Sequence, residues 1–348
     1  MTVELEFAIA RIIHHQHLIE PGTTIVVAVS GGPDSMALLH IFAALRQRLS
    51  CDPVAVYVDH GLRPDEIPDE ISCVRKAAAA LDLPWEIISV PTREFAAKEN
   101  LSIEHAARNL RYQALRSCAK KYGATRIAVA HTADDQAEEV LLRLLRGSGR
   151  KGLAGMRLFS KDVIRPLLTT AKSRILEYLA GHKIAFCHDS SNDDLRFLRN
   201  RVRHVLLPLL EKEFDPGIRR SLLKTADSLS EDEDYLHGIV DAACGQLVKA
   251  GTDEKGEPLY VLDRAGFVGL HSCLQRRLVE RLLWLVGCPA RYTSIMDIQA
   301  AALAGRNGSE LHLSRGLRVG VTRKTLRLSY PRGKTAWRGS LHDHVQII

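Results

Sequence analysis

Residues 30–35 carry the chemical groups that bind a phosphate chain, namely Ser30, Gly31, Gly32, Pro33, Asp34 and Ser35. The β-branched run 24–29 before them predicts a buried parallel strand, and the apolar stretch 36–45 after them predicts a buried helix. The glycines let the backbone approach a ligand closely, and Pro33 suits the first helical turn. Free N–H groups at a helix start attract an anion, serine hydroxyls add donors, and Asp34 can hold Mg2+ against a phosphate. This stretch therefore predicts a pyrophosphate-binding loop at a strand-to-helix turn.

Polar residues also follow two other predicted strands. Asp59 and His60 come after the apolar stretch 53–58, and His131 comes after the stretch 126–130. Ligands in open α/β sheets bind at the carboxyl ends of the strands, so we expect all three residues near the phosphate loop. For His60 the sequence leaves a second interpretation open, in which the imidazole only caps a loop through hydrogen bonds.

Two carboxylates, Asp135 and Glu138, lie three residues apart near the start of the helix predicted over 133–146. Both lie off its apolar stripe, so they can converge on one ligand. The neighbouring Glu139 has Arg143 four residues on and is explained by a surface ion pair, whereas Glu138 has no such local partner. We therefore expect Asp135 and Glu138 to grip a cation or to abstract a proton. The alternative is that they only favour the helix dipole.

Arg108 and Arg111 share one face of the helix predicted over 103–121. Two arginines on a common face can grip a phosphate through paired N–H donors. Glu104 lies four residues before Arg108, however, with the polarity that favours an ordinary ion pair along a helix. Spacing alone leaves both interpretations open.

A second basic face is predicted on a helix that precedes Pro208. Ser191 and Asp194 have the spacing of a helix start. The arginines after them recur at helical intervals without an interleaved acid, at Arg196, Arg199 and Arg203. Because arginine forks match phosphate oxygens, we interpret this face as a phosphate-binding surface. Pro208 should end or kink the helix.

The segment 146–152, Arg-Gly-Ser-Gly-Arg-Lys-Gly, contains a GxGxxG spelling. A dinucleotide-binding fingerprint must follow a strand, whereas this segment follows a helix, so we exclude a Rossmann nucleotide site there. Its three cations among glycines predict a mobile phosphate-binding loop or a plain solvated loop.

Composition excludes several classes of protein. With 348 residues, of which 46% are hydrophobic and 26% charged, the chain has the make-up of a soluble globular protein with two or three domains. No run approaches the ~18–20 apolar residues of a membrane span, and the acidic start is unlike a signal peptide. The seven cysteines are scattered, which argues against a disulfide framework or a zinc knuckle and predicts a cytoplasmic location. The net charge of +7 favours a polyanionic partner.

The alternation of strands and helices predicts the fold class. Over residues 1–215 it predicts a doubly wound, mostly parallel α/β sheet that carries the phosphate loop. Over 216–348 we expect a helical linker region and a smaller α+β domain with a short antiparallel sheet. Between residues 311 and 340 there is no acid but there are eight cations: Arg315, Arg318, Arg323, Lys324, Arg327, Arg332, Lys334 and Arg338. This density predicts a nucleic-acid-binding face, with a solvated basic edge as the alternative.

In this order the motifs resemble those of the tRNA(Ile)-lysidine synthases, which are N-type ATP pyrophosphatases with a PP-loop. The matching stretches span about residues 24–210, and the most specific are Asp-Asp-Gln-Ala-Glu at 134–138, Arg-Gly-Ser-Gly at 146–149 and Arg-Asn-x-x-Arg at 199–203. Family members commonly have a second histidine at the position of Thr132 and a threonine at that of Glu139, so we assign these two positions no role. The last third matches loosely, and we expect one C-terminal domain where some members have two.

The resemblance implies that ATP, Mg2+ and L-lysine convert the wobble cytidine of a tRNA(Ile) with a CAU anticodon into lysidine, so that the tRNA reads AUA instead of AUG. Residues 30–35 would bind ATP together with Asp59, His60, Arg108 and His131, with Asp34 near the metal. Asp135 and Glu138 would hold the lysine. The arginines that would bind phosphate or the adenylate are Arg108, Arg111, Arg199 and Arg203. The oligomeric state stays open, a homodimer included.

Three alternatives remain. A tRNA thiolase with the same loop would need a catalytic cysteine pair or cluster ligands, which the cysteine spacing does not offer. An amide-forming adenylating ligase that acts on a small molecule would not need the basic C-terminal stretch. A non-catalytic RNA-binding module would keep the arginines but would have no need of Asp34, Asp135 and Glu138 together.

Overall fold

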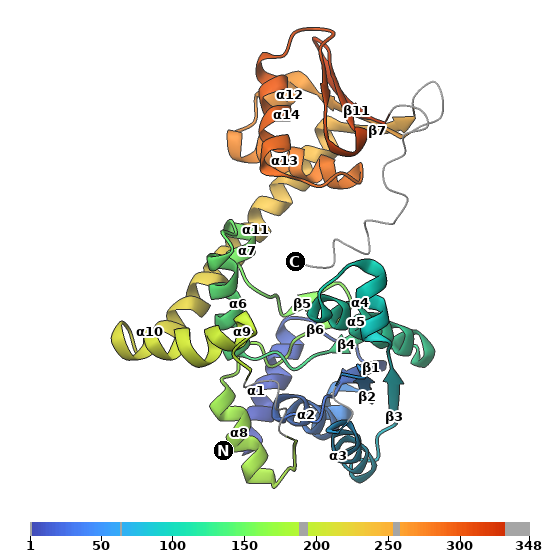
Figure 1. Ribbon diagram of the computed structural model, residues 1–348, viewed down its shortest axis with the longest axis vertical. Helices are drawn as coiled ribbons and strands as arrows, with labels where there is room; N and C mark the ends of the chain where they lie inside the picture. Colours follow the sequence, from blue (N-terminus) through green and yellow to red (C-terminus); the bar gives the residue numbers. More distant parts are fainter. Residues whose placement is uncertain (1, 63–64, 188–193, 253–257, 331–348) are drawn as a thin grey trace. The chain divides into compact units, whose positions relative to one another are not determined.

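The computed structural model describes residues 2–62, 65–187, 194–252 and 258–330 (Figure 1). The chain divides into two compact units, Met1–Ser230 and Glu231–Ile348. The first contains a six-stranded sheet and the second a five-stranded antiparallel sheet. Within the described ranges, no helix combines the length and the apolar character that crossing a lipid bilayer demands.

The sheet of the first unit has the strand order β3-β2-β1-β4-β6-β5. Its strands are β1 (Thr23–Ala28), β2 (Cys51–Asp59), β3 (Trp85–Ser89), β4 (Arg126–Ala128), β5 (Phe159–Ser160) and β6 (Val163–Ile164). All neighbours pair in parallel except β5, which pairs antiparallel with β6. The strand order reverses between β1 and β4, which is where open α/β sheets place their ligands. The predicted doubly wound, mostly parallel sheet is therefore confirmed.

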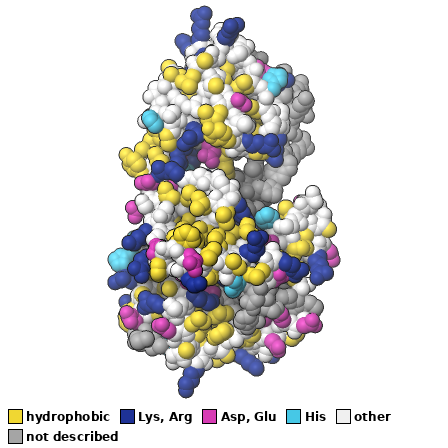
Figure 2. Space-filling model, turned by 60° about the vertical axis from the view of Figure 1, so that its left-hand side comes forward, with side chains coloured by type: hydrophobic (Ala, Val, Ile, Leu, Met, Phe, Trp, Pro, Cys, Tyr) yellow, Lys and Arg dark blue, Asp and Glu magenta, His cyan; other side chains and the backbone are white. Residues whose placement is uncertain are grey.

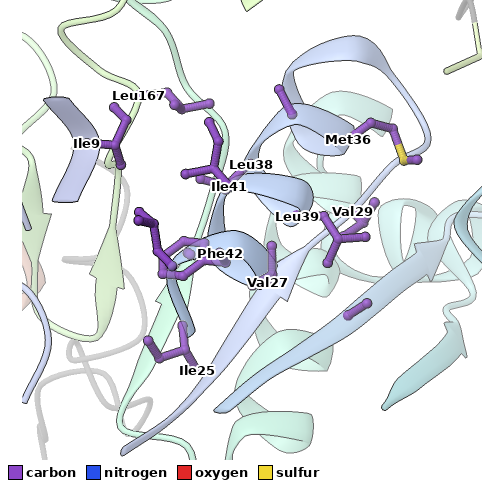
Figure 3. Packing of buried hydrophobic residues seen from close by; sticks show 14 of the residues in the cluster. Ile9, Ile25, Val27, Val29, Met36, Leu38, Leu39, Ile41, Phe42 and Leu167 are labelled. Atoms are coloured by element: carbon purple, nitrogen blue, oxygen red, sulfur yellow. The ribbon is translucent and has the colours of Figure 1, made fainter. Parts of the chain in front are cut away.

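Helices cover both faces of this sheet. In chain order they are α1 (Thr2–His15), α2 (Pro33–Leu49), α3 (Ile67–Ala80), α4 (Thr92–Glu99), α5 (Ile103–Tyr122), α6 (Ala133–Leu145), α7 (Arg150–Leu153) and α8 (Lys172–His182). Ile25 and Val27 of β1 belong to a core cluster with residues of α1, α2, α3 and α8, whereas Val26 and Ala28 belong to a cluster with residues of α5. Figure 3 shows the first cluster around Phe42 of α2. Because β1 is buried on both faces, the phosphate loop (residues 30–35) that follows it stands on a rigid support.

One helical stretch of the first unit is irregular. It consists of α9 (Leu198–Arg201), the π-helical turn η2 (Val202–Leu206) and α10 (Leu207–Glu213). The helix begins at Leu198 and not near Asp194, and Ser191 lies outside the described residues. The disturbance predicted at Pro208 takes the form of the π turn directly before it, because proline has no N–H to donate and its ring crowds the preceding turn. The chain nevertheless stays helical through Pro208.

In the second unit, helices pack on the antiparallel sheet, whose order is β7-β8-β11-β10-β9. Its strands are β7 (Val248–Thr252), β8 (Pro258–Asp263), β9 (Glu310–His312), β10 (Arg318–Val321) and β11 (Thr325–Ser329). The helices are α12 (Arg264–Val268), α13 (Ser272–Leu285) and α14 (Tyr292–Ala304), with a short 3-10 turn η3 (Ser314–Gly316). The division between the units falls within the long helix α11 (Ile218–Leu247). The antiparallel sheet predicted over 310–330 is confirmed, and β7 and β8 extend it.

The basic stretch of the second unit is only partly described. Arg332, Lys334 and Arg338 lie outside the described residues. The exposed cations within them are Arg315, Arg323, Lys324 and Arg327. Arg318 Nη1 pairs with Glu310 Oε1 of the neighbouring strand at 3.1 Å, so one cation is neutralised by an acid just outside the counted stretch. On the face shown in Figure 2, lysine and arginine side chains form separate groups with hydrophobic side chains between them. A nucleic-acid-binding face in this unit stays a prediction.

Candidate functional site

The phosphate loop forms the predicted turn between β1 and α2. Gly31 has φ +82°, which a side chain would strain, and a Cβ there would lie 3.5 Å from the backbone of Glu70. Ser35 Oγ donates to the carbonyl of Gly32 at 2.9 Å and accepts from the N–H of Ser30 at 3.1 Å. These bonds fix the turn, while no side chain of the described residues caps the start of α2. The first N–H groups of the helix are therefore available to an anion.

Asp34, in the first turn of α2, meets a cation from a distant part of the chain. Lys172 Nζ donates to Asp34 Oδ1 at 2.5 Å, and the two side chains are 34% and 28% exposed. Burial raises the pKa of Asp34 above its ordinary value, although the ammonium of Lys172 acts in the opposite direction. The charges of Asp135 and Arg203 also act on the Asp34 carboxyl group, so the structure brings these three predicted site residues together.

Asp135 and Glu138 face two arginines from the irregular helical stretch. Arg203 donates to Glu138 Oε1 from Nε at 2.6 Å and to Oε2 from Nη2 at 3.0 Å, and Arg199 Nε donates to Oε2 at 3.0 Å. Asp135 Oδ1 accepts from Nη2 of Arg203 at 3.0 Å and of Arg199 at 3.2 Å. The Glu138 side chain is only 1% exposed, and a carboxylate so deeply buried needs such charged partners. These contacts agree with the interpretation that the two acids bind a cation. The cations that they bind in this structure are Arg199 and Arg203 of the same chain.

The start of α6 holds Asp135 in position. Thr132 Oγ1 accepts from the N–H of Asp135 at 3.3 Å, and Asp135 Oδ2 accepts from the N–H of Thr132 at 2.8 Å, which makes a capping box. Burial opposes ionisation of Asp135, but the guanidinium of Arg199 and the cap hydrogen bond keep its pKa below the ordinary value. Thr132, to which the sequence assigned no role, thus orients a predicted site residue. Glu139 forms the predicted ion pair with Arg143, at 2.7 Å.

The prediction that Arg196, Arg199 and Arg203 share one helical face is wrong for Arg196, whereas a phosphate contact of Arg199 and Arg203 stays a prediction. Arg196 precedes α9, and its 88% exposed side chain pairs with Asp194 at 2.7 Å. Arg199 and Arg203 instead turn towards α6, because apolar residues of α6 and of η2 pack in one core cluster. The acids that neutralise these two arginines lie more than sixty positions earlier in the chain, where helix periodicity cannot reveal them.

His131 follows β4 and is held as a neutral ring. Arg165 Nε donates to His131 Nδ1 at 3.2 Å, which leaves the ring proton on Nε2. Burial, helped by the positive charge of Arg165, lowers the pKa of His131 to about 3 although the negative charge of Asp135 acts in the opposite direction. Arg165 is itself buried and anchored, since its Nη1 donates to the carbonyl of Arg157 at 2.9 Å. His131 therefore has one N–H donor to offer at neutral pH.

Asp59 and His60 lie at the end of β2, the neighbour of β1. Asp59 Oδ1 accepts from the N–H of Gly61 at 2.7 Å, and Oδ2 accepts from Ser89 Oγ at 3.3 Å. His60 Nδ1 lies 3.4 Å from Thr92 Oγ1. These contacts agree with the loop-capping interpretation of His60, and a contact of either residue with ATP stays a prediction.

Arg108 and Arg111 lie on α5, as predicted. The structure places the Arg108 guanidinium 5.5 Å from the ring centre of Tyr112. Burial lowers the pKa of Arg111, and the nearby positive charge of Arg108 acts in the same direction. Two cations this close favour an anion between them, and their phosphate contact stays a prediction.

The glycine-rich segment after α6 is joined to that helix by hydrogen bonds, and both the mobile phosphate-binding loop and the plain solvated loop stay open. Arg143 Nη1 donates to the carbonyls of Gly152 and Gly155 at 2.8 and 3.2 Å. Gln136 exchanges two hydrogen bonds with the backbone of Met156, at 2.9 and 2.7 Å. A Cβ on Gly155 would lie 2.6 Å from the Gln136 amide, so this close approach requires glycine. The segment also contains the single helical turn α7. Its exposed cations are Arg146, Arg150 and Lys151.

The sequence analysis did not identify three residues of the site: Lys172, Asp134 and Arg165. The N–H of Lys172 donates to Asp134 Oδ2 at 2.7 Å, and Asp134 Oδ1 accepts from Arg219 Nη1 at 3.0 Å. The signal for Lys172 was its place as the first helical residue after β6, since helix starts at the carboxyl ends of strands line the ligand site of such sheets. The signal for Asp134 was its place beside Asp135.

Around the phosphate loop, three acidic side chains are paired with three basic side chains. The acids are Asp34, Asp135 and Glu138, and the cations are Lys172, Arg199 and Arg203. The loop can bind a polyphosphate through backbone and hydroxyl donors. The acids can bind an ammonium group or a metal ion once their present partners move, and the released cations can then bind phosphate oxygens.

Comparison with known proteins places this chain in a family. Residues 1–210 match the family model described as PP-loop domain. The chain is 36% identical over 312 residues to the tRNA(Ile)-lysidine synthase of Symbiobacterium thermophilum, covering 87% of this chain but 64% of that relative, slightly less than two thirds of its length. It is 41% identical over 267 residues to the tRNA(Ile)-lysidine synthase of Rhodopseudomonas palustris, covering 74% of this chain and 73% of the relative.

One solved structure shows the fold alone. The U34-tRNA thiolase NcsA from Methanococcus maripaludis, described with its [4Fe-4S] cluster, matches with a TM-score of 0.55 and 17% identity. The match covers 66% of this chain and 79% of that one. At this identity the likeness extends to the arrangement of strands and helices and carries no information about the reaction.

Proposed function

We propose that this chain, which belongs to the tRNA(Ile)-lysidine synthase family of PP-loop proteins, uses ATP to join L-lysine to the wobble cytidine of a tRNA(Ile) with a CAU anticodon. The observation that carries the proposal is the carboxylate pair Asp135 and Glu138, bound to guanidinium groups beside an anion-binding turn. A carboxylate pair that already holds cations has the chemistry to hold the ammonium group of lysine.

The first step is adenylation of the cytidine. The C2 oxygen of the base attacks the α-phosphorus of ATP, the bond to the bridging oxygen breaks, and pyrophosphate leaves with the electron pair. The N–H groups at the start of α2 and the hydroxyls of Ser30 and Ser35 would stabilise the charge that develops on this leaving group. Arg108 and Arg111 would bind the nucleotide phosphate or the adenylate.

The donor set near the loop fits Mg2+. This ion is usually held by one or two carboxylates and the phosphates of the substrate. Asp34 supplies one carboxylate at the loop, and within the described residues no three His, Cys, Asp or Glu side chains gather as a ready-made metal cage. Asp34 would therefore hold Mg2+ together with the phosphates of ATP, and the ion would supply positive charge to the departing pyrophosphate.

The second step is attack by lysine. Asp135 and Glu138 would receive the lysine, one of them would take a proton from its side-chain ammonium, and the free amine would attack C2 and expel AMP. For this, Arg199 and Arg203 must release part of their hold on the two acids, which the negative charge of the bound nucleotide favours. His131, a neutral N–H donor, would hydrogen-bond the nucleotide or the base and is not available as a general base.

The tRNA would contact both units. Reaction at the wobble base requires it to be splayed out of the anticodon loop, as sequence-specific recognition of single-stranded RNA generally does. The exposed cations of the second unit would bind phosphates of the tRNA and set its position. All seven cysteines are free thiols, in keeping with a reaction in the reducing cytoplasm.

The proposal is tested by incubating the protein with ATP, labelled lysine and tRNA transcripts and mapping the label. We expect label at the wobble base of the CAU-anticodon tRNA(Ile), and none in a methionine tRNA transcript with the same anticodon. Asp34→Ala should abolish incorporation, and full activity of that variant would contradict the metal role. ATP turnover with lysine but without tRNA would instead support a small-molecule ligase.

A further inference from the structure

Lys172 makes a contact that the proposed reaction does not yet use. Its ammonium group lies 2.5 Å from the carboxylate that would hold the metal, and 138 residues separate the two in the chain. Both side chains are about one-third exposed, so the pair lies at the open side of the phosphate loop and is not locked in the core. Among the described residues, Lys172 is the cation that hydrogen-bonds to this loop.

The fold positions the side chain of Lys172 next to the phosphate loop. The residue is the first of α8, and its N–H is fixed by Asp134 Oδ2 at 2.7 Å. Asp134 is fixed in turn by Arg219 at 3.0 Å, which also pairs with Glu211 at 2.7 Å. Farther along the helix, the buried side chain of Ile175 packs in the core cluster of α2. The backbone of Lys172 is thus rigid, while its four-carbon side chain ends in a partly exposed ammonium that is free to turn.

The charges explain what this ammonium can do. The donors of the phosphate loop itself are backbone N–H groups and hydroxyls, which carry no full charge. ATP brings about four negative charges to the loop, and phosphates in such sites are commonly met by a lysine as a point charge. The metal and the ammonium are both cations and repel each other, so a metal bound to Asp34 would weaken the pair between Asp34 and Lys172.

We propose that Lys172 is a further catalytic residue, which holds Asp34 in place of the metal before the nucleotide binds and then transfers its ammonium to the phosphates that leave as pyrophosphate. This inference rests on the proposed adenylation. When ATP and its metal bind, Asp34 would hold the metal and would release Lys172. Lys172 keeps its proton throughout and neutralises the charge that develops on the bridging oxygen as the bond to the α-phosphorus breaks.

A metal titration without substrates tests the exchange. Mn2+ is added to the full-length protein in the absence of ATP, lysine and tRNA, and free Mn2+ is followed by electron paramagnetic resonance. Lys172→Met removes the competing cation, so we expect Mn2+ to bind about tenfold more tightly, as the loss of a charge-assisted hydrogen bond to Asp34 implies. Lys172→Arg should bind Mn2+ as the parent does. Arg174→Met, which removes an exposed cation from the same helix, is the matched control.

Kinetics test the second half of the inference. In Lys172→Met the rate constant of tRNA-dependent pyrophosphate release should fall about 100-fold or more, as it does when a donor to developing oxygen charge is lost. Lys172→Arg should recover most of the rate, and the KM for lysine should not change. Unchanged Mn2+ affinity with a lower melting temperature would reduce Lys172 to a structural residue and overturn the inference.

The two proposals fail in different ways. If the parent protein transfers no lysine to tRNA, the proposed function falls, while tighter Mn2+ binding by Lys172→Met would still establish the exchange at Asp34. If the parent transfers lysine, and Lys172→Met equals it in both Mn2+ affinity and pyrophosphate release, the role of Lys172 is refuted and the proposed function stands. Should Lys172→Met not fold, Lys172→Gln replaces it, because the amide keeps a neutral donor to Asp34 and should give an intermediate Mn2+ affinity.

Discussion

Glu138→Gln separates the structural from the catalytic role of the buried ion-pair network. Glu138 is 1% exposed and accepts three N–H bonds from Arg199 and Arg203, at 2.6 to 3.0 Å. Removing one partner of a buried ion pair costs roughly 3–5 kcal/mol. Here Asp135 still accepts one bond from each guanidinium, and both arginines are about 30% exposed, so we expect the lower end, about 3 kcal/mol. For a unit of this size that loss lowers the melting temperature by roughly 6–12 °C.

The same variant tests the proposed lysine site. An ammonium that loses one charge-assisted hydrogen bond should bind about 10–100-fold more weakly, so the KM for lysine rises by that factor. The KM for ATP should stay the same or fall, because the arginines become freer to meet phosphates. Glu139→Gln is the matched control, since its pair with Arg143 lies along one helix and contributes about 0.5 kcal/mol, and its oxygen lies 3.8 Å from Arg199, beyond hydrogen-bond distance. Equal losses of stability in the two variants, or a larger effect on ATP than on lysine, would refute the reasoning.

Three further predictions concern the loop, His131 and the RNA. Gly31→Ala should lower the free energy of unfolding by about 1–2 kcal/mol, because alanine is strained at a positive φ, and should raise the KM for ATP. Gly22→Ala is the control: its φ is +79° and nothing lies near its Cβ position, so it should lower the stability and leave the KM unchanged. The pKa of His131 is about 3 in the folded protein and 6.5 in the unfolded chain, so its contribution to the free energy of unfolding is fully present above pH 6.5 and falls towards pH 3. Between pH 7.5 and 5.5 the free energy of unfolding of the parent should therefore fall by about 1.4 kcal/mol more than that of His131→Asn, which denaturant titrations would measure. Arg323→Ala should weaken cognate and non-cognate tRNA alike and reduce the salt slope of binding by about 1, and an unchanged slope would place the RNA elsewhere.

Local patterns were sufficient for the fold of the first unit. Strand β1 and helix α2 are buried almost all round, so their hydrophobic runs were visible without knowledge of neighbours. The phosphate loop was visible because a left-handed turn such as that at Gly31 requires glycine. The two-residue strands β5 and β6 are too short to show any hydrophobic period.

The site was predictable in its members but not in their pairing. Asp135, Glu138, Arg199 and Arg203 were all singled out, yet the sequence assigned the arginines to phosphate and the acids to substrate. Partners separated by more than sixty residues are set by how α6 packs on η2, and helix spacing contains no information about that contact. Lys172 was missed for the same reason, since only the tertiary structure brings it to Asp34.

The contrast with Arg264 argues that the network between α6 and α9 is kept for function. Arg264 donates to three backbone carbonyls, those of Ala302, Thr322 and Gly305, at 2.7 to 2.9 Å, and so fixes the second unit without any acid. Its acceptors belong to the backbone and cannot exchange. Replacing a buried ion-pair network by apolar residues is often neutral or stabilising, so stability alone does not explain why Arg199 and Arg203 are paired with carboxylates. Carboxylates and guanidiniums can instead exchange their partners for an ammonium and a phosphate, which is what the proposed joining of lysine to an adenylated base would require.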